Sequence, residues 1–554
     1  MSAETAQSTQ PAVRRTTTPI SPWSAGALAI AALVCMPIAA VLVLAFAPTE
    51  NIWPHLMATT LPRYLGHSLR LTLAVGALSA MVGAGAAWLV VMYRFPGRRW
   101  LEWALLLPLA IPAYVGAYAL VDFLEYAGPV QRGLRAAMGW QSPADYWFPA
   151  IRSEPAAAMV LSAALYPYVY LLTRAAFREQ SAGVYEVARA LGARGLGRFR
   201  RVGLPLARPA IAAGAAIAMM ETVSDFGVVD YFGVQTLTTG IFTTWLEMGN
   251  AGGAAQIACV ILAVVGALVA LEKIGRRRVR FHRPSRSDRP AVPQPLPRLA
   301  GWAACAVCVA PVALGFVLPV GVIGAHALRH PDAWVDPALA RALWHTLTAA
   351  GGAAVITVTA ALFMVYGMRL SGRALPRLVL PFTTLGYAAP GAVLGLGLLI
   401  PLAALDNRLA DAVQALTGHD PGLLLTGSAA AVVLAYVVRF FAIAQGAADA
   451  GMGRIAPSLP MAARTLGRSA GGTLRAVHLP LMRSSVGTAL LLVFVDAVKE
   501  LPATLLLRPF NYNTLSTRVY EQASLEKLGE AAPAALLVMA VGLVATGVLA
   551  RANR

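Results

Sequence analysis

Four acidic residues interrupt stretches of the sequence that are otherwise apolar. Glu221 and Asp225 lie four residues apart in one stretch, and Asp496 and Glu500 lie four apart in another. If both stretches are helices that cross a membrane, each pair projects from one helix face. Ionisable side chains inside a bilayer are costly and usually face a cavity or a partner. Carboxylate oxygens are also the ligands that hard cations prefer, so we expect the four acids to form an oxygen-rich constriction.

A second interpretation gives the same acids a structural part. Lys499 and Arg508 are close to them in the sequence and would neutralise them by pairing. Hydrogen bonds to neighbouring helices would equally make the carboxylates gate or packing elements. The residues themselves leave contact with a passing cation and structural pairing both open.

The helices that must position these acids follow from composition. The chain of 554 residues is 58% hydrophobic and 13% charged, whereas soluble domains carry about 25% charged residues, so an integral membrane protein is expected. Helices are expected because lipid satisfies no open backbone group, and a spanning helix needs roughly 20 apolar residues. The acid-bearing stretches 207–231 and 484–507 add two spans to ten uncharged ones, which predicts an all-α protein of about twelve spans. The uncharged stretches are 24–47, 71–93, 103–121, 155–173, 251–271, 299–328, 342–368, 378–405, 421–438 and 531–550.

Positive charge is concentrated in a few connecting segments. The net charge is +19, and much of it lies between spans two and three, four and five, and six and seven. The positive-inside rule places these segments, and with them both termini, in the cytoplasm. Residues 1–23 are interpreted as a cytoplasmic tail before an uncleaved first span. The basic linker 273–298 is expected to lie beside anionic membrane lipid, and nucleic acid is not expected as a partner.

The chain repeats itself. His67-Ser68-Leu69 corresponds to His345-Thr346-Leu347, and Pro112 corresponds to Pro390 at the same offset. Two transmembrane halves of about six spans, 24–272 and 299–554, are therefore predicted, joined by the linker. An even number of spans gives both halves the same orientation, with a pseudo-twofold axis along the membrane normal.

The most specific repeat is a pair of basic loops. "EVARALGARGLGRFRRVGLPL" (186–206) superposes without a gap on "MAARTLGRSAGGTLRAVHLPL" (461–481). Residues 181–191 are expected to form a short helix whose Val184, Val187 and Leu191 supply an apolar face for a partner protein. Gly192 permits a close approach or a left-handed exit from that helix, either of which a side chain would hinder. The Leu-Pro is expected to end an extended segment and begin the next span.

This loop resembles the hallmark of the permease subunits of bacterial ATP-binding-cassette (ABC) importers, which reads E-A-A, three residues, G, nine residues, I-x-L-P. Val187 and Met461 depart from that pattern, and Met461 removes the acid from the second copy. The resemblance implies the type I importer permease fold and two loops that couple to a cytoplasmic ABC ATPase homodimer. The coupling residues it implies are Glu186, Ala188, Gly192, Leu204, Pro205, Ala463, Gly467, Leu479 and Pro480.

Within that family, the segments 224–250 and 496–524 look most like the ferric iron branch. The resemblance therefore implies a bacterial inner-membrane pathway for ferric iron, delivered by a periplasmic substrate-binding protein. Relatives that carry thiamine, phosphonate, polyamine or sulfate-like anions remain alternatives. An ion-gradient-driven secondary transporter, with the acids as a proton relay, is a further alternative that the paired loops disfavour.

The chain itself is not expected to be an enzyme. A P-loop needs Lys followed by Ser or Thr after a Gly-rich turn, and the three lysines, Lys273, Lys499 and Lys527, are followed by Ile, Glu and Leu. ATP hydrolysis is therefore expected in a separate chain, and no cofactor or firmly assigned metal site is expected in this one.

Overall fold

The computed structural model describes residues 21–193, 195–277, 293–371, 379, 382–383 and 389–552. Most of the predicted tail 1–23 and of the linker 273–298 lies outside these residues. Eleven described helices are long and apolar enough to cross a membrane, or twelve if the pair Arg98–Ala110 and Ala113–Met138, bent by 95°, is one span. The predicted all-α membrane fold with about twelve spans is confirmed.

The first half of the chain contains thirteen α-helices, one short strand and several 3-10 and π segments among the described residues. They are α1 (Pro22–Phe46), α2 (Trp53–Ala58), α3 (Leu61–Met92), β1 (Tyr93–Arg94), α4 (Arg98–Ala104), η1 (Leu107–Ala110), α5 (Ala113–Leu124), α6 (Pro129–Met138), η2 (Pro143–Asp145), α7 (Glu154–Arg178), α8 (Ala182–Ala190), α9 (Gly195–Arg198), η3 (Phe199–Gly203), α10 (Leu204–Ser224), α11 (Gly227–Tyr231), α12 (Leu237–Phe242), η4 (Thr243–Glu247) and α13 (Ala251–Arg277).

The second half contains one short strand and several α-helices, 3-10 and π segments among the described residues. They are β2 (Gln294–Pro295), α14 (Arg298–Val312), η5 (Ala313–Val317), α15 (Leu318–Arg329), η6 (Pro331–Trp334), α16 (Pro337–Ser371), α19 (Gly391–Thr417), α20 (Ala429–Gly453), α21 (Ser458–Thr465), α22 (Ala470–Thr473), η7 (Leu474–His478), α23 (Leu479–Lys499), α24 (Pro502–Leu507), α25 (Leu515–Ser524) and α26 (Leu528–Ala552).

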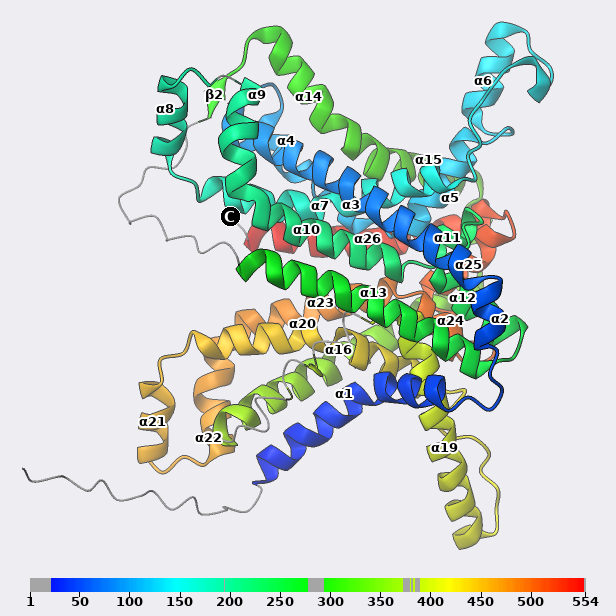
Figure 1. Cartoon of the computed structure of the whole chain (residues 1–554). Helices are drawn as coiled ribbons and strands as arrows, with labels where there is room; N and C mark the ends of the chain where they lie inside the picture. The colour runs from blue at the N-terminus through cyan, green and yellow to red at the C-terminus, as the bar shows by residue number, and fades with distance from the viewer. Residues whose placement is uncertain are drawn as a thin grey trace, which may run out of the picture.

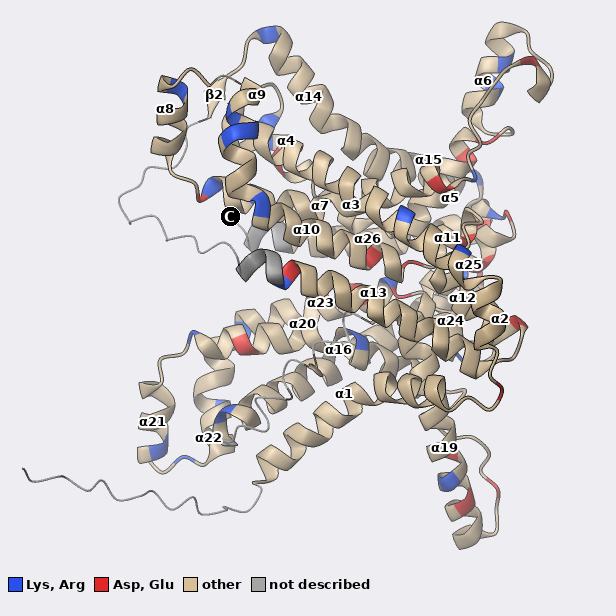
Figure 2. Ribbon diagram, viewed as in Figure 1, with Lys and Arg blue, Asp and Glu red and all other residues tan. Residues whose placement is uncertain are grey.

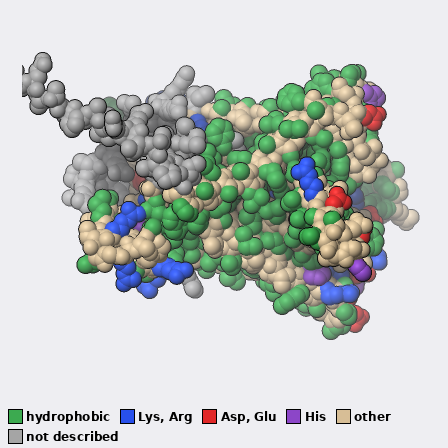
Figure 3. Space-filling model, turned by 90° about the horizontal axis from the view of Figure 1, so that it is seen from below, with side chains coloured by type: hydrophobic (Ala, Val, Ile, Leu, Met, Phe, Trp, Pro, Cys, Tyr) green, Lys and Arg blue, Asp and Glu red, His purple; other side chains and the backbone are tan. Residues whose placement is uncertain are grey.

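The long helices run between two ends of different character (Figure 1). One end carries α8, α9, α21 and α22, where lysines and arginines are frequent, and we call it the basic end (Figure 2). The opposite end carries α6, α12, α25 and the tip of α19. Hydrophobic side chains cover the middle of the molecule, with charged side chains toward both ends (Figure 3), as a membrane-embedded belt requires. Helix α1 begins and α26 ends at the basic end.

The first span of each half packs against the other half. Helix α1 contacts α16 and α19 as well as α13, and α15 contacts α5 as well as α26. Trp23 at the start of α1 stacks on Phe363 of α16, with ring centroids 4.8 Å apart. A Cβ at Gly367 would lie 2.6 Å from the Trp23 carbonyl oxygen. Small residues allow such close approach where lipid supplies no hydrophobic force between helices.

Matched hydrogen bonds support the predicted internal repeat. In the first half the Leu237 amide donates to the Ser68 hydroxyl over 2.9 Å. At the corresponding place in the second half the Leu515 amide donates to the Thr346 hydroxyl over 2.8 Å. The preceding threonines, Thr236 and Thr514, each form a capping box with the threonine three residues later. The two halves therefore fix α12 and α25 by the same contacts.

A short parallel pairing closes the first half at the basic end. Tyr93 and Arg94 of β1 pair with Gln294 and Pro295 of β2, and the Leu296 amide donates to the Arg94 carbonyl over 3.2 Å. The chain that follows α13 thus returns to the end of α3 before it enters α14.

The contact between α1 and α19 generates a stability prediction. A Cβ at Gly397 would lie 2.2 Å from the Pro37 carbonyl oxygen, and overpacking costs typically 1–3 kcal/mol. Gly397→Ala should therefore lower the thermal unfolding midpoint of the detergent-solubilised protein by several degrees. Gly446→Ala, at a helical glycine with open space around it, is the control and should leave the midpoint unchanged or raise it. An equal response of the two variants would contradict the close approach.

Candidate functional site: two surface loops and a charged cavity between the halves

The first basic loop forms the expected helix with an exposed apolar face. In α8, Val184, Val187 and the following Leu191 are 44%, 61% and 82% exposed. In α21 the apolar residues Leu459 and Met461, with Leu466 after the helix, are exposed in the same way. Both helices therefore present apolar side chains outward at the basic end, and Glu186 is exposed on α8 beside them.

Both helices end in the same glycine motif. Gly192 has φ +82° and Gly467 has φ +80°, and a Cβ at either position would meet nothing within 4 Å. The Ala193 amide donates to the carbonyl of Ala188, and the Arg468 amide donates to that of Ala463. This bond five residues back is the Schellman C-cap. The predicted left-handed exit is confirmed in both loops, and backbone conformation, rather than crowding, is the reason for glycine.

The segment before each Leu-Pro is helical, so the expectation of an extended segment is wrong. Residues 195–224 form one helix, α9 to α10, with the π segment η3 inside it. The Leu204 amide donates to Phe199, five residues back, and the Leu479 amide donates to Leu474 in the same way. The next residue in each case, Pro205 or Pro480, lacks an amide hydrogen and clashes with a regular turn, and π bulges commonly accommodate such breaks.

An aromatic side chain from an earlier span, α3 or α16, supports each loop. Trp88 of α3 packs against Gly203, where a Cβ would lie 2.5 Å from the indole. At the corresponding place Tyr366 of α16 meets the His478 ring edge-on, with centroids 5.2 Å apart, and donates to the Ala470 carbonyl. In the first half the large Trp88 side chain thus packs against a glycine. In the second half the smaller rings of Tyr366 and His478 pack against each other.

All four predicted acids line one cavity of about 200 Å³. Glu221 lies in the last turn of α10 and Asp496 in the last turn of α23. Asp225 and Glu500 follow the ends of these two helices. The cavity also takes residues from η1, α5, α7 and α20, so both halves of the chain build it.

The expectation that each acid pair projects from one helix face is wrong. Helix α10 ends at Ser224 and α23 ends at Lys499, so Asp225 and Glu500 occupy extended residues after the helices. The Asp225 carboxylate accepts from the Val228 and Val229 amides at 2.9 and 3.2 Å. The Glu500 carboxylate accepts from the Ala503 amide at 3.0 Å. The two acids therefore cap the short helices α11 and α24, whose first amides have no partner within the helix.

Arg439 of α20 is the partner of Glu500. Its Nε lies 2.8 Å from Oε2 of Glu500, and the two side chains are 14% and 4% exposed. The alternative partners considered from the sequence have other contacts. The Lys499 ammonium donates to the Leu109 carbonyl over 2.7 Å, and Arg508 pairs with Glu521. Glu500 is therefore paired with a basic residue, as the structural interpretation expects. That residue is Arg439, which the sequence reasoning missed.

The charges of the cavity are distributed unequally between the halves. Counted from the matched starts of α7 and α20, the position of Arg439 corresponds to Ala164. By the same count in α10 and α23, Lys499 corresponds to Ser224. All four residues line the cavity. Both basic groups thus come from the second half, whereas the first-half wall carries acids without a basic residue.

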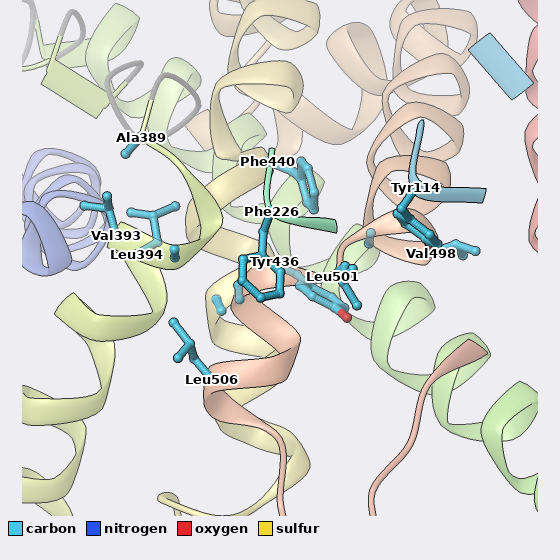
Figure 4. Close-up of a cluster of buried hydrophobic side chains, with 14 of the residues drawn as sticks. Tyr114, Phe226, Ala389, Val393, Leu394, Tyr436, Phe440, Val498, Leu501 and Leu506 are labelled. Carbon is cyan, nitrogen blue, oxygen red and sulfur yellow. The ribbon is translucent and has the colours of Figure 1, made fainter. Parts of the chain in front are cut away.

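A hydrophobic cluster encloses the cavity at the contact of the halves. Figure 4 shows Tyr114 and Phe226 from the first half near Tyr436, Phe440 and Leu501 from the second. Among the described residues, no three His, Cys, Asp or Glu side chains are close enough together to hold a metal ion. The acids therefore lie spread along the cavity wall.

The buried ion pair generates a second prediction. Arg439→Gln leaves the Glu500 carboxylate buried without its charge partner, and breaking a buried pair in this way costs about 3–5 kcal/mol. The thermal unfolding midpoint should fall strongly in this variant and should recover in the double variant Arg439→Gln, Glu500→Gln. Arg408→Gln, on the exposed part of α19, is the control. Equal loss in the single and double variants would show that the pair does not stabilise the protein through its charges.

Comparison with known proteins agrees with this architecture. Residues 76–280 match the family described as binding-protein-dependent transport system inner membrane component. The Fe(3+)-transport system permease protein FbpB 2 of Haemophilus influenzae is 24% identical over 481 residues, which cover 85% of this chain and 86% of that protein.

Shorter similarities extend over less of the chain. The molybdenum transport system permease protein ModB of Escherichia coli is 29% identical over 38% of this chain and 93% of its own length. The sulfate transport system permease protein CysT of Salmonella typhimurium is 26% identical over 37% of this chain and 72% of its own length. The match to ModB covers most of that protein but less than half of this chain, whereas the similarity to FbpB 2 extends over most of the chain. The chain is therefore similar to multi-pass permeases of binding-protein-dependent transport systems, with the family match in its first half and the likeness to FbpB 2 along most of its length.

Proposed function

We propose that this importer permease forms the membrane pathway for ferric iron. The observation that carries the proposal is the cavity between the halves with four carboxylate side chains on its wall. A hard cation prefers such oxygen ligands. The similarity to a ferric iron permease along 85% of the chain supports the same cargo. A periplasmic binding protein would deliver the iron to the end of the molecule that carries α6, α12 and α25.

The distribution of charge supports an orientation with the basic end in the cytoplasm. The loops that contain Arg94, Arg189 and Arg475 all lie at that end, together with the start of α1 and the end of α26. Lys and Arg concentrate on cytoplasmic loops. In this orientation both termini are cytoplasmic, and the tip of α19 and the segment around α6 reach into the periplasm.

The exposed faces of α8 and α21 are proposed to dock a homodimeric ABC ATPase. An amphipathic helix binds a partner by placing its apolar face in a groove, and Val187 and Leu466 are among the apolar side chains that have no cover in this chain. Each loop continues through a π segment into a helix that ends at an acid of the cavity. Movement of the ATPase subunits would therefore be transmitted along α10 and α23 to Glu221 and Asp496.

An oxyanion is the second candidate cargo, because the same cavity contains two basic residues. One terminal nitrogen of Arg439, Nη1, is buried and has no hydrogen-bond partner among the described residues, and Lys499 lines the same cavity. The shorter similarities to the ModB and CysT permeases agree with an anion. The cavity wall carries four acidic and two basic side chains. This excess of acidic groups favours a cation over an anion as the cargo.

The cargo prediction uses a host that lacks its own importers and expresses this chain with its ATPase and binding protein. Uptake of radioactive iron should exceed uptake of molybdate and of sulfate. Glu221→Gln with Asp496→Asn should reduce iron uptake by about tenfold, which corresponds to ~1.4 kcal/mol, while ATP hydrolysis stimulated by the binding protein persists. Asp411→Asn, exposed on α19, is the control. Import of molybdate or sulfate without iron would refute the ferric assignment.

The coupling prediction concerns Gly192 and Gly467, whose backbone has the left-handed conformation. A side chain at positive φ costs roughly 1–2 kcal/mol, so Gly192→Val with Gly467→Val should disturb the exit from both docking helices. Less ATPase should co-purify, or ATP hydrolysis should become uncoupled from uptake. Gly418→Val introduces the same strain at the C-cap of α19, at the opposite end of the molecule, and should preserve both. Normal transport by the double variant would remove the coupling assignment.

A further inference from the structure

A row of tyrosines connects the cavity with the opposite end of the molecule. Tyr114 of α5 lines the cavity, and its ring centroid lies 5.9 Å from that of Tyr118, one helical turn further along. Tyr118 meets Tyr231 of α11 edge-on, with centroids 4.5 Å apart. Arg152 covers the Tyr231 ring at 5.0 Å. The side chains thus make a continuous series from the cavity to the charged residues at the molecule's end, and we call Tyr114, Tyr118 and Tyr231 the tyrosine row.

The outermost tyrosine of the row is the most exposed of the three. Tyr118 is fully buried and Tyr114 is 5% exposed, whereas Tyr231 is half-buried and the neighbouring Asp230 is exposed. The Asp230 carboxylate accepts from the hydroxyl of Tyr520, on α25 of the second half, over 2.7 Å. The outer end of the row is therefore accessible to water and is bounded by a contact between the two halves.

Tyr118 has a hydroxyl that the fold does not use. This hydroxyl is buried and has no hydrogen-bond partner among the described residues. The Tyr114 hydroxyl differs, because it lies beside the Ser516 hydroxyl, which donates to the Val498 carbonyl and can accept from Tyr114. Leaving a buried hydroxyl unpaired is unfavourable, and phenylalanine would fill the same space without that cost. The Tyr118 oxygen therefore points to a ligand that the fold itself does not supply.

The row belongs to one half alone. At the positions that correspond to Tyr114 and Tyr118, counted from Pro112 and Pro390, the second half has Ala392 and Leu396, both buried. Arg439 and Lys499 stand on the second-half wall of the cavity. Because like charges repel strongly in a region of low dielectric, a cation in this cavity is driven away from the second half and toward the acids of the first.

We propose that the tyrosine row is the outer passage through which a hard metal cation reaches the cavity. The proposal rests on the proposed ferric iron function and assigns the route within it. Hydroxyl oxygens of Tyr231, Tyr118 and Tyr114 replace part of the cation's water shell in turn, and the carboxylates of Asp225 and Glu221 receive it on the first-half wall. The passage lies to one side of the pseudo-twofold axis. The contact of Tyr520 with Asp230 closes its outer end in this conformation.

The test removes the two inner oxygens and keeps the rings. Tyr114→Phe with Tyr118→Phe should lower uptake of radioactive iron about tenfold, equivalent to ~1.4 kcal/mol, with the thermal midpoint and the stimulated ATP hydrolysis unchanged. Tyr166→Phe is a matched control, because the Tyr166 hydroxyl is also buried and unpartnered but lies in a separate cluster around Trp88. Its iron uptake should equal that of the wild type.

The outcomes separate this proposal from the function on which it rests. If the wild type imports iron and the double variant imports it equally well, the row is not the passage, although the ferric function stands. If uptake falls equally in Tyr166→Phe, the effect is one of general packing, and the passage is again refuted. If the wild type imports an oxyanion and no iron, the ferric function fails and this route fails with it.

Discussion

Each half of this permease ends a long helix inside the protein, where the backbone of the next short helix needs hydrogen-bond partners. Lipid supplies none, and a helix begins with amides that have no partner of its own. Asp225 and Glu500 satisfy those amides from the side chain. The helix breaks, the turn of the chain and the position of the cavity all depend on these two carboxylates, and so does the need for Arg439 next to Glu500.

The capping contacts also explain why the charges on the cavity wall differ between the two halves. A carboxylate held by backbone amides has part of its charge stabilised, so Asp225 can stand without a basic neighbour. Glu500 has a single capping amide and an arginine. The two halves thus share the geometry of the helix break and differ in their charges, which leaves one wall of the cavity acidic and the other mixed.

The sequence predicted those features that depend on local pattern. Spacing located the two glycine-capped loops, and the repeat brought the four acids to corresponding places, because periodicity and special backbone angles are written in neighbouring residues. The helix ends were misjudged at Asp225 and Glu500, although Gly227 and Pro502 follow closely and Pro restricts the residue before it. Arg439 was missed because it directly follows the apolar stretch 421–438, whereas α20 continues to Gly453.

Other features could not be predicted from the sequence. An apolar helix surface is equally suited to lipid and to another helix, so nothing in the residues of α1 says that it packs against α16 of the other half. The pairing of β1 with β2 involves two residues on each side and has no pattern of its own. The tyrosine row depends on contacts between α5, α11 and α25, which lie far apart in the chain.

The exchanged first spans make the two halves an interlocked pair. Each half holds a helix that belongs, by sequence, to the other, so neither can move away as a rigid body without carrying or sliding past a span of its counterpart. Severing the chain between α13 and β2 would break a covalent bond and leave this mechanical linkage in place.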